Sequence, residues 1–196
     1  MDYRDKILAG ISALAGLFSA LMGGVKLGGV AGIFMGMGFL VSSAFSGFLL
    51  VWGREVLLRK WMVLFAFFYP MGLILSLVWK FFPEKRLVFV LFAISGWLFI
   101  LVAHTYSKDW GSFAVALVHG GAGLGLFMLP VVLNGRGLIP AGFQWFSLGS
   151  LVLALMGFGL LHYFSKEEGK IQFFWDAVPG ALALSSVLYA MAIYYL

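Results

Sequence analysis

Long apolar stretches alternate with short polar segments along the whole chain of 196 residues. A helix of about 20 apolar residues crosses the hydrocarbon core of a bilayer, which is about 30 Å thick. Such a helix also satisfies its own backbone hydrogen bonds in lipid. The pattern predicts membrane-spanning helices, seven in all, at residues 7–22, 27–52, 61–79, 87–106, 112–133, 143–164 and 173–196.

The composition supports this reading. Apolar residues make up 63% of the chain and charged residues only 11%, whereas soluble domains carry roughly 25% charged residues. So few charges cannot cover a soluble fold, but lipid requires no polar covering. We therefore expect an all-α integral membrane protein: a compact bundle of seven transmembrane helices that forms one transmembrane domain over residues 1–196, with the lipid bilayer around it and no soluble domain.

The charged residues indicate an orientation. We call the face that carries the N-terminus side A and the opposite face side B. Side A holds eight of the 13 basic residues and seven of the eight acidic ones. Side B holds the C-terminus and the remaining basic residues Lys26, Lys80, Lys85, Arg86 and Arg136. The positive-inside rule places side A, with the N-terminus, in the cytoplasm and the C-terminus outside. Turns account for the net charge of +5, so no nucleic-acid partner is expected.

A short pattern recurs on side A. Residues 104–111 (HTYSKDWG) and 162–169 (HYFSKEEG) share the sequence H-x-x-S-K-[D/E]-x-G. The spans that follow the side-A turns contain Pro70, Pro130 and Pro179, where helix kinks are expected. The pattern favours one leading helix followed by three two-helix repeat units. The alternative is that aromatic belts followed by loop bases produce the similarity without duplication.

Glycines recur at intervals of four residues, a spacing that lets helix backbones pack closely. The predicted helix-packing seam consists of Gly24, Gly28, Gly32, Gly36, Gly121 and Gly125. This glycine stripe is also a candidate interface with a second copy or a partner membrane subunit, and a path lined by small residues is the functional alternative. The glycine cluster at residues 23–29 must also interrupt the helix, because one helix from 7 to 52 would exceed the bilayer thickness.

Ionisable residues near membrane depth supply the candidate ligand or proton site. It comprises His104, His119, His162, Asp109 and Asp176, all in the half of the membrane near side A. His104 and His162, at matched depth, are candidate axial ligands of a haem iron. Three histidines can also bind zinc, or one can relay a proton. Alternatively, the outer two are interfacial residues, and Asp176 caps the last helix.

No catalytic motif stands out. The chain has no cysteine, and it lacks the H-E-x-x-H metalloprotease signature and the G-K-[S/T] ending of a phosphate-binding loop. Ser42, Ser43 and Ser46 can form hydrogen bonds between helices. We therefore assign no catalytic residues. The sequence favours a protein that is not an enzyme, and a membrane-embedded hydrolase or transferase stays as the remaining alternative.

The leading functional hypothesis is a transporter or channel for a small solute or ion, with a polar site in the side-A half. Internal repeats and interrupted helices are recurrent in transporters, and no cofactor is expected. The first alternative is a redox membrane subunit that binds haem b or quinone. The second is a structural or assembly subunit of a larger membrane complex.

Overall fold

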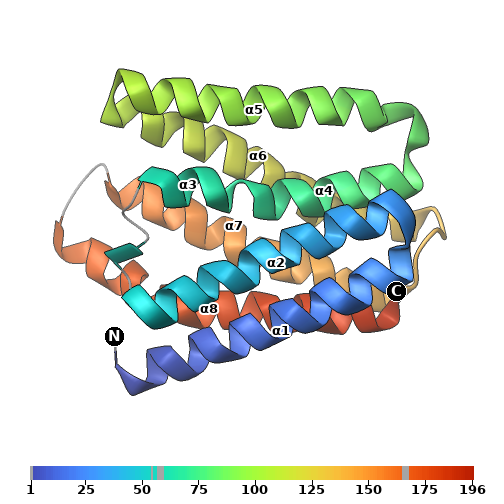
Figure 1. The fold of residues 1–196 in the computed structure, drawn as a ribbon, viewed down its shortest axis with the longest axis horizontal. Helices are drawn as coiled ribbons and strands as arrows, with labels where there is room; N and C mark the ends of the chain where they lie inside the picture. The colour runs from blue at the N-terminus through green and yellow to red at the C-terminus, as the bar shows by residue number, and fades with distance from the viewer. Residues whose placement is uncertain (1, 54, 57–59, 165–167) are drawn as a thin grey trace.

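The chain is built from helices (Figure 1), which confirms the predicted all-α class. The computed structural model describes residues 2–53, 55–56, 60–164 and 168–196; among these, the side chains of residues 60, 63, 104, 108, 109, 112, 116, 157–164 and 168–175 are not described. The elements are α1 (Tyr3–Leu27), α2 (Gly29–Trp52), α3 (Lys60–Ala66), α4 (Phe68–Phe81), η2 (Pro83–Lys85), α5 (Arg86–Tyr106), α6 (Lys108–Gly135), η3 (Ala141–Gln144), α7 (Trp145–Phe164) and α8 (Glu168–Tyr195).

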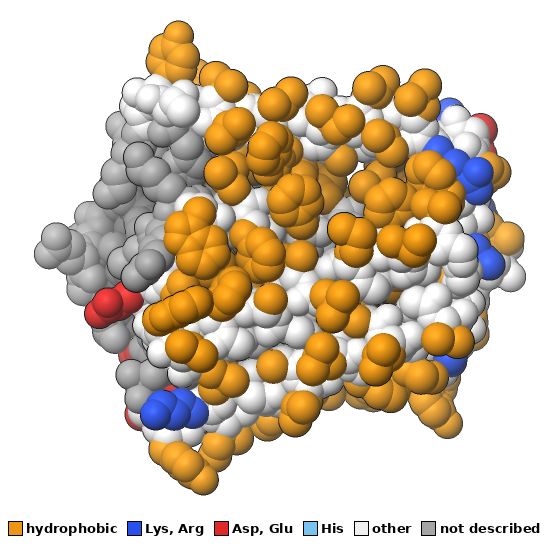
Figure 2. Space-filling view, viewed as in Figure 1, with side chains coloured by type: hydrophobic (Ala, Val, Ile, Leu, Met, Phe, Trp, Pro, Cys, Tyr) orange, Lys and Arg blue, Asp and Glu red, His pale blue; other side chains and the backbone are white. Residues whose placement is uncertain are grey.

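Most of these helices are suited to a bilayer. Within the described residues, six stretches are long and apolar enough to cross it: Tyr3–Leu27, Gly29–Trp52, Leu64–Phe81, Pro83–Ala103, Phe113–Gly135 and Asp176–Tyr195. A shorter apolar helical stretch, Ala141–Met156, covers the start of α7. Figure 2 shows hydrophobic side chains across the middle of one face and charged side chains towards its two ends. The protein is thus an integral membrane protein that crosses the bilayer several times.

The helices form a closed ring. Around it, α1 packs against α2, α2 against α4, α4 against α6, α6 against α7, α7 against α8, and α8 against α1. Helix α5 lies outside this ring, where it packs against α4 and α6 (Figure 1). Aromatic rings of Phe39, Tyr69, Phe146 and Tyr189 meet in the centre, and the Phe146 and Tyr189 ring centroids are 4.6 Å apart. The middle of the ring is therefore filled by side chains.

The predicted interruption in the glycine cluster lies at Gly28, between α1 and α2. Gly28 and Gly29 have φ angles of 65° and 50°, which residues with a Cβ rarely adopt. The Gly28 N–H donates to the Gly24 carbonyl at 3.1 Å, which closes the end of α1. Gly28 therefore shapes the turn instead of lying in a packing seam, which corrects its predicted role.

The remaining glycines of this stripe face one another across the α1–α2 hairpin. Gly24 lies on α1 and Gly32 on α2, on opposite sides of the turn that the glycine cluster forms. A Cβ added to Gly32 would collide with the Gly24 carbonyl, and one added to Gly36 would lie 3.5 Å from the Ala20 carbonyl oxygen. The four-residue spacing thus continues through the turn and brings two backbones together.

The shorter stripe on α6 behaves differently. A Cβ on Gly125 would contact the Ile74 side chain of α4 at 3.4 Å, whereas one on Gly121 would meet nothing within 4 Å. Gly121 is exposed, so the expected packing of this residue against another helix of the chain is wrong. A seam that the spacing did not reveal joins α2 to α4, where a Cβ on Gly72 would lie 3.0 Å from the Gly38 Cα atom.

The helix that contains Pro70 has a one-residue break in its hydrogen-bond pattern at Phe67, although Phe67 keeps helical φ and ψ angles of −56° and −39°. Helix α3 ends at Ala66 and α4 begins at Phe68. Pro70 has no N–H and so cannot donate to the Ala66 carbonyl, which leaves one helical hydrogen bond unmade. In contrast, α6 and α8 continue through Pro130 and Pro179. Phe67, at the interruption, lies about 10 Å by helical rise from the start of α3, in the half of the bundle near side A.

Basic side chains on side B bind the C-terminal ends of helices. The Lys26 ammonium donates to the Tyr194 carbonyl at 2.6 Å, and the Arg86 guanidinium donates twice to the Trp79 carbonyl at 2.7 and 3.1 Å. The last carbonyls of a helix lack partners and carry partial negative charge, so these contacts are favourable. Side A carries the N-terminal ends of α1, α3, α6 and α8. Acidic side chains are favourable near a helix N-terminus. Asp2, for example, accepts a hydrogen bond from the Asp5 N–H at 2.8 Å.

The contact between Gly24 and Gly32 yields a stability prediction. The substitution Gly32→Ala should destabilise the protein by about 1–3 kcal/mol, because the new methyl group forces α1 and α2 apart. The midpoint of thermal unfolding in mild detergent measures the change.

Gly47→Ala is the matched control, because Gly47 lies on the same helix and an added Cβ meets nothing within 4 Å there. This variant should unfold at the temperature of the unchanged protein or slightly above it. Equal unfolding temperatures for the two variants would contradict the close approach of α1 and α2.

Candidate functional site

His119 lies beside the interruption between α3 and α4. Its imidazole meets the Phe67 ring edge to face, with ring centroids 6.5 Å apart and an interplanar angle of 76°. The Nδ1 atom is buried near the Val115 backbone, but it forms no hydrogen bond with acceptable geometry. The interrupted helix thus contacts the histidine that the sequence places deepest in the membrane.

Trp97 on α5 flanks the same interruption. Its indole ring lies 6.4 Å from the Phe68 ring, and Phe67 and Phe68 are themselves 5.7 Å apart, centroid to centroid. The preceding residue, Gly96, allows close approach, because a Cβ there would lie 3.2 Å from a Val118 methyl group of α6. The Trp97 Nε1 atom is buried without a hydrogen-bond partner. This donor therefore lies at a position where a hydrogen-bond acceptor would be stabilised.

Tyr69 follows the interruption on the side of the central axis. Its ring lies 6.2 Å from the Tyr189 ring, at an interplanar angle of 90°. The Tyr69 hydroxyl is buried and approaches the hydroxyls of Ser42 and Tyr189, without the geometry of a hydrogen bond to either. The Tyr189 hydroxyl, by comparison, is 3.0 Å from Ser150 Oγ.

Three consecutive residues meet different partners here: Phe67 contacts His119, Phe68 contacts Trp97, and Tyr69 contacts Tyr189 on the central axis. We call Phe67, Phe68 and Tyr69, together with Trp97 and His119, the break site. Among the described side chains, four buried nitrogen or oxygen atoms lack a hydrogen-bond partner, and three of them belong to the break site. The fourth is Ser19 Oγ on α1. A buried polar group without a partner costs about 1–3 kcal/mol. Such groups mark positions where a partner of complementary chemistry would be stabilised.

A second polar group joins three helices. Ser46 Oγ of α2 lies 2.8 Å from Ser12 Oγ of α1, which in turn lies 2.9 Å from Ser186 Oγ of α8. All three side chains are buried. Ser43 also donates to the Ala13 carbonyl of α1 at 3.1 Å. The predicted hydrogen bonding of Ser43 and Ser46 between helices is therefore confirmed. These serine hydroxyls have partners, whereas the Tyr69 hydroxyl of the break site has none among the described residues.

The three histidines lie at different positions along their helices. His119 is well inside α6, about 17 Å by helical rise from the first residue of that helix. His104 and His162 lie in the last turns of α5 and α7, and both of those helices pack against α6. The side chains of His104, His162 and Asp109 lie outside the described residues, so their predicted role as metal or haem ligands stays a prediction.

Asp176 is an exposed residue within α8, which begins at Glu168. It is therefore not the N-terminal cap of that helix, as the alternative interpretation had it. Helix α7 packs between α6 and α8, so Asp176 does not face His119 from a neighbouring helix. The predicted grouping of this carboxylate with the histidine is not formed.

Sequence reasoning missed several polar residues of the interior. These are Ser12, Tyr69, Trp97, Ser150, Ser186 and Tyr189. Serine, tyrosine and tryptophan are common at membrane interfaces and in apolar helices, so residue type alone did not distinguish them. One available signal was the position of Tyr69 directly before Pro70, where a helix interruption was expected.

No protein-family model, curated protein or solved structure was found to match this chain. The assignment of a function therefore depends on the geometry of the interior described above.

The serine contacts yield a second stability prediction. In a double-mutant cycle, Ser12→Ala and Ser186→Ala should show a coupling energy of about 0.6 kcal/mol, the average measured for side-chain hydrogen bonds between membrane helices. The coupling arises because either substitution already removes the shared hydrogen bond. Unfolding of the single and double variants in detergent measures it.

Ser95, an exposed residue on α5, provides the control. The cycle formed by Ser12→Ala and Ser95→Ala should show no coupling. Additive effects of Ser12→Ala and Ser186→Ala would contradict a direct hydroxyl contact between α1 and α8.

Proposed function

We propose that this protein is a membrane transporter for a small polar solute, with its substrate site at the break site. The observation that carries the proposal is that three buried polar atoms without a hydrogen bond of acceptable geometry, from Tyr69, Trp97 and His119, belong to residues on or beside the helix break at Phe67. Interrupted helices near the middle of the bilayer are a common device for substrate binding in transporters. The site lies in the half near side A, as the position of Phe67 along its helix indicates.

The chemistry of the break site favours a neutral solute. The Trp97 indole can only donate a hydrogen bond, whereas the Tyr69 hydroxyl can donate or accept one. A neutral imidazole donates from one ring nitrogen and accepts at the other. The Ala66 carbonyl, which Pro70 cannot bond, supplies an acceptor. The residues that define the site include no carboxylate or ammonium group. A molecule that both donates and accepts hydrogen bonds would complement these groups better than an inorganic ion.

The filled centre of the helix ring favours a transporter over a permanently open channel. Phe39, Phe146 and Tyr189 pack against one another on the axis, so a solute can pass only when these rings move. The hydrogen bond that Pro70 cannot form weakens the helix at Phe67, so we expect bending between α3 and α4 to be easiest there. Movement of α4 would displace Tyr69, whose ring contacts Phe39 at 6.4 Å, centroid to centroid.

The topology we propose has seven spans, with α7 (Trp145–Phe164) as the sixth in chain order and α3–α4 as a single interrupted span. Side A faces the cytoplasm, so the break site is nearer to the cytoplasmic surface. Repeat units and an oligomer through the glycine stripe are not needed for this mechanism.

Flux measurements on reconstituted protein test the proposal. Proteoliposomes are mixed in a stopped-flow light-scattering instrument with urea, acetamide, glycerol or glycinamide, and with sodium chloride for comparison. At least one of the organic solutes should enter faster than it enters protein-free vesicles. Tyr69→Phe and His119→Leu should each slow this entry about 5- to 10-fold, because each removes one hydrogen bond to the solute.

Ser19→Ala is the matched control, because it removes a buried hydroxyl without a partner that lies on α1 instead of at the break site. This variant should transport at the unchanged rate. The proposal is contradicted if no solute enters faster than in protein-free vesicles, or if the three variants slow entry equally.

A further inference from the structure

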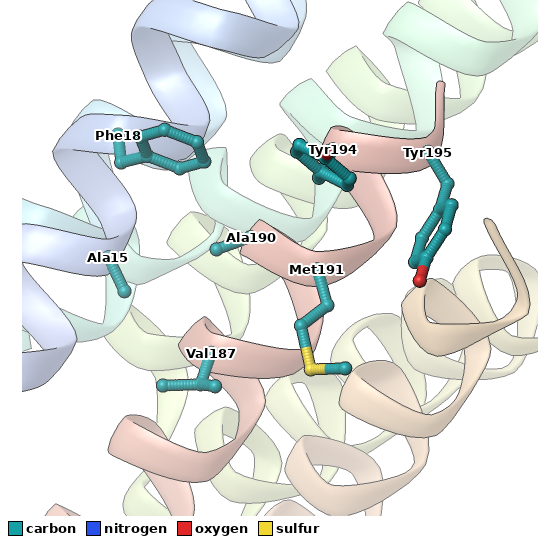
Figure 3. Close-up of a pocket in the computed structure, with 7 residues that line it drawn as sticks. All are labelled: Ala15, Phe18, Val187, Ala190, Met191, Tyr194 and Tyr195. Carbon is teal, nitrogen blue, oxygen red and sulfur yellow. The ribbon is translucent and has the colours of Figure 1, made fainter. Parts of the chain in front are cut away.

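A groove runs along the outside of the bundle between α1 and α8, the first and last helices of the ring (Figure 3). Its volume is about 320 Å³, and it is lined by Ala15, Phe18, Val187, Ala190, Met191, Tyr194 and Tyr195. In Figure 3 the Phe18 ring extends from α1 towards α8, over the small side chain of Ala190. The lining is apolar apart from the two tyrosine hydroxyls, which lie near the end of α8.

The groove opens towards lipid. Phe18 and Met191 on its two walls are 43% and 38% exposed, although both are hydrophobic. Because the surrounding helices cross the bilayer, hydrocarbon chains and not water meet these surfaces. The small side chains of Ala15 and Ala190 create the depression between the larger walls.

The length and direction of the groove match one lipid leaflet. Val187 lies about 12 Å by helical rise from the end of α8, and Ala15 lies about 18 Å from the end of α1. Both helices end on side B, where the Lys26 ammonium of α1 contacts the Tyr194 carbonyl of α8. The groove therefore extends from the side-B interface to about the middle of the bilayer, a depth of about 15 Å.

The Lys26 side chain places a positive charge at the side-B end of the groove. The Lys26 ammonium lies 5.7 Å from the centroid of the Tyr194 ring, which lines the groove. Lys80 adds a second charge nearby, because its ammonium donates to the Leu27 carbonyl at 3.4 Å. An ammonium group has three donors, so Lys26 can bind an anion while it keeps its bond to Tyr194. Figure 2 shows Lys and Arg side chains gathered at this end of the molecule.

We infer that this groove binds one acyl chain of an anionic phospholipid from the side-B leaflet, with the lipid phosphate held by Lys26. The chain lies between Phe18 and Met191 and the headgroup reaches the interface at Tyr194. Basic residues between membrane helices bind anionic headgroups on the cytoplasmic side of membranes, and we propose the same contact for Lys26 in the outer leaflet, which side B faces in the topology given above. A helix of a second copy is a poorer match, because its diameter of about 10–12 Å exceeds what a shallow groove between two packed helices accepts.

Native mass spectrometry of the purified protein tests this inference. The protein is mixed with phosphatidylglycerol or with phosphatidylcholine of identical acyl chains, and the bound fraction of each is measured. The unchanged protein should retain more phosphatidylglycerol. Lys26→Ala should lower that retention about fivefold, the effect expected of one basic residue at a membrane surface, and Lys26→Arg should preserve it.

Two further variants separate the groove from general attraction between charges. Lys85→Ala removes an exposed side-B charge on η2, which packs against α4 and α5, and should leave retention unchanged. Ala190→Phe fills the groove and should lower retention of both lipids, with its unfolding temperature confirming that it folds. Equal retention of the two lipids by the unchanged protein, or equal loss in Lys26→Ala and Lys85→Ala, would overturn the inference. A dimer mass that Ala190→Phe abolishes would assign the groove to a second copy.

Discussion

Close approach of helix backbones is the constraint on which this structure depends. Helices surrounded by lipid gain little from burying apolar surface against one another, because lipid tails are as apolar as leucine. Attraction must then come from van der Waals contact and hydrogen bonds, both of which require short distances. The backbones of Gly24 and Gly32 meet across the first hairpin, and those of Gly38 and Gly72 meet across the next pair of helices. Gly149 of α7 extends the same arrangement, since a Cβ there would lie 3.1 Å from the Ser185 carbonyl oxygen of α8.

This constraint explains which parts of the fold could be predicted. Helix positions follow from apolar length, and a turn within the glycine cluster follows from bilayer thickness, so the sequence located both to within a few residues. The order of helices around the ring was not accessible, because helices apolar on every side carry no periodic signal that identifies their neighbours. The pairing of Gly38 with Gly72 and the outward position of Gly121 depend on that order.

In the candidate site, too, some residues could be predicted from the sequence and others could not. His119 was recognisable because an ionisable group at membrane depth is rare, and the structure places it against the interrupted helix. Its partners were not recognisable, because Trp97 and Tyr69 resemble the many aromatic residues of the chain. Asp176 was grouped with the histidine on the basis of depth, and the position of α7 between their helices separates the two. Depth along a span can be read from sequence, whereas the direction around the bundle cannot.

The hydroxyl contact between Ser12 and Ser186 has a consequence for biosynthesis. These residues belong to α1 and α8, the first and last helices of the ring in chain order, so α1 is synthesised before α8. The α1–α2 hairpin can form early, because its contacts are close in sequence. Until α8 is inserted, however, the side of α1 that contacts α8 faces lipid, and Ser12 has, among the described residues, only Ser46 of α2 as a partner. The ring therefore cannot close before α8 is inserted, and the serine pair distinguishes a closed ring from an open one.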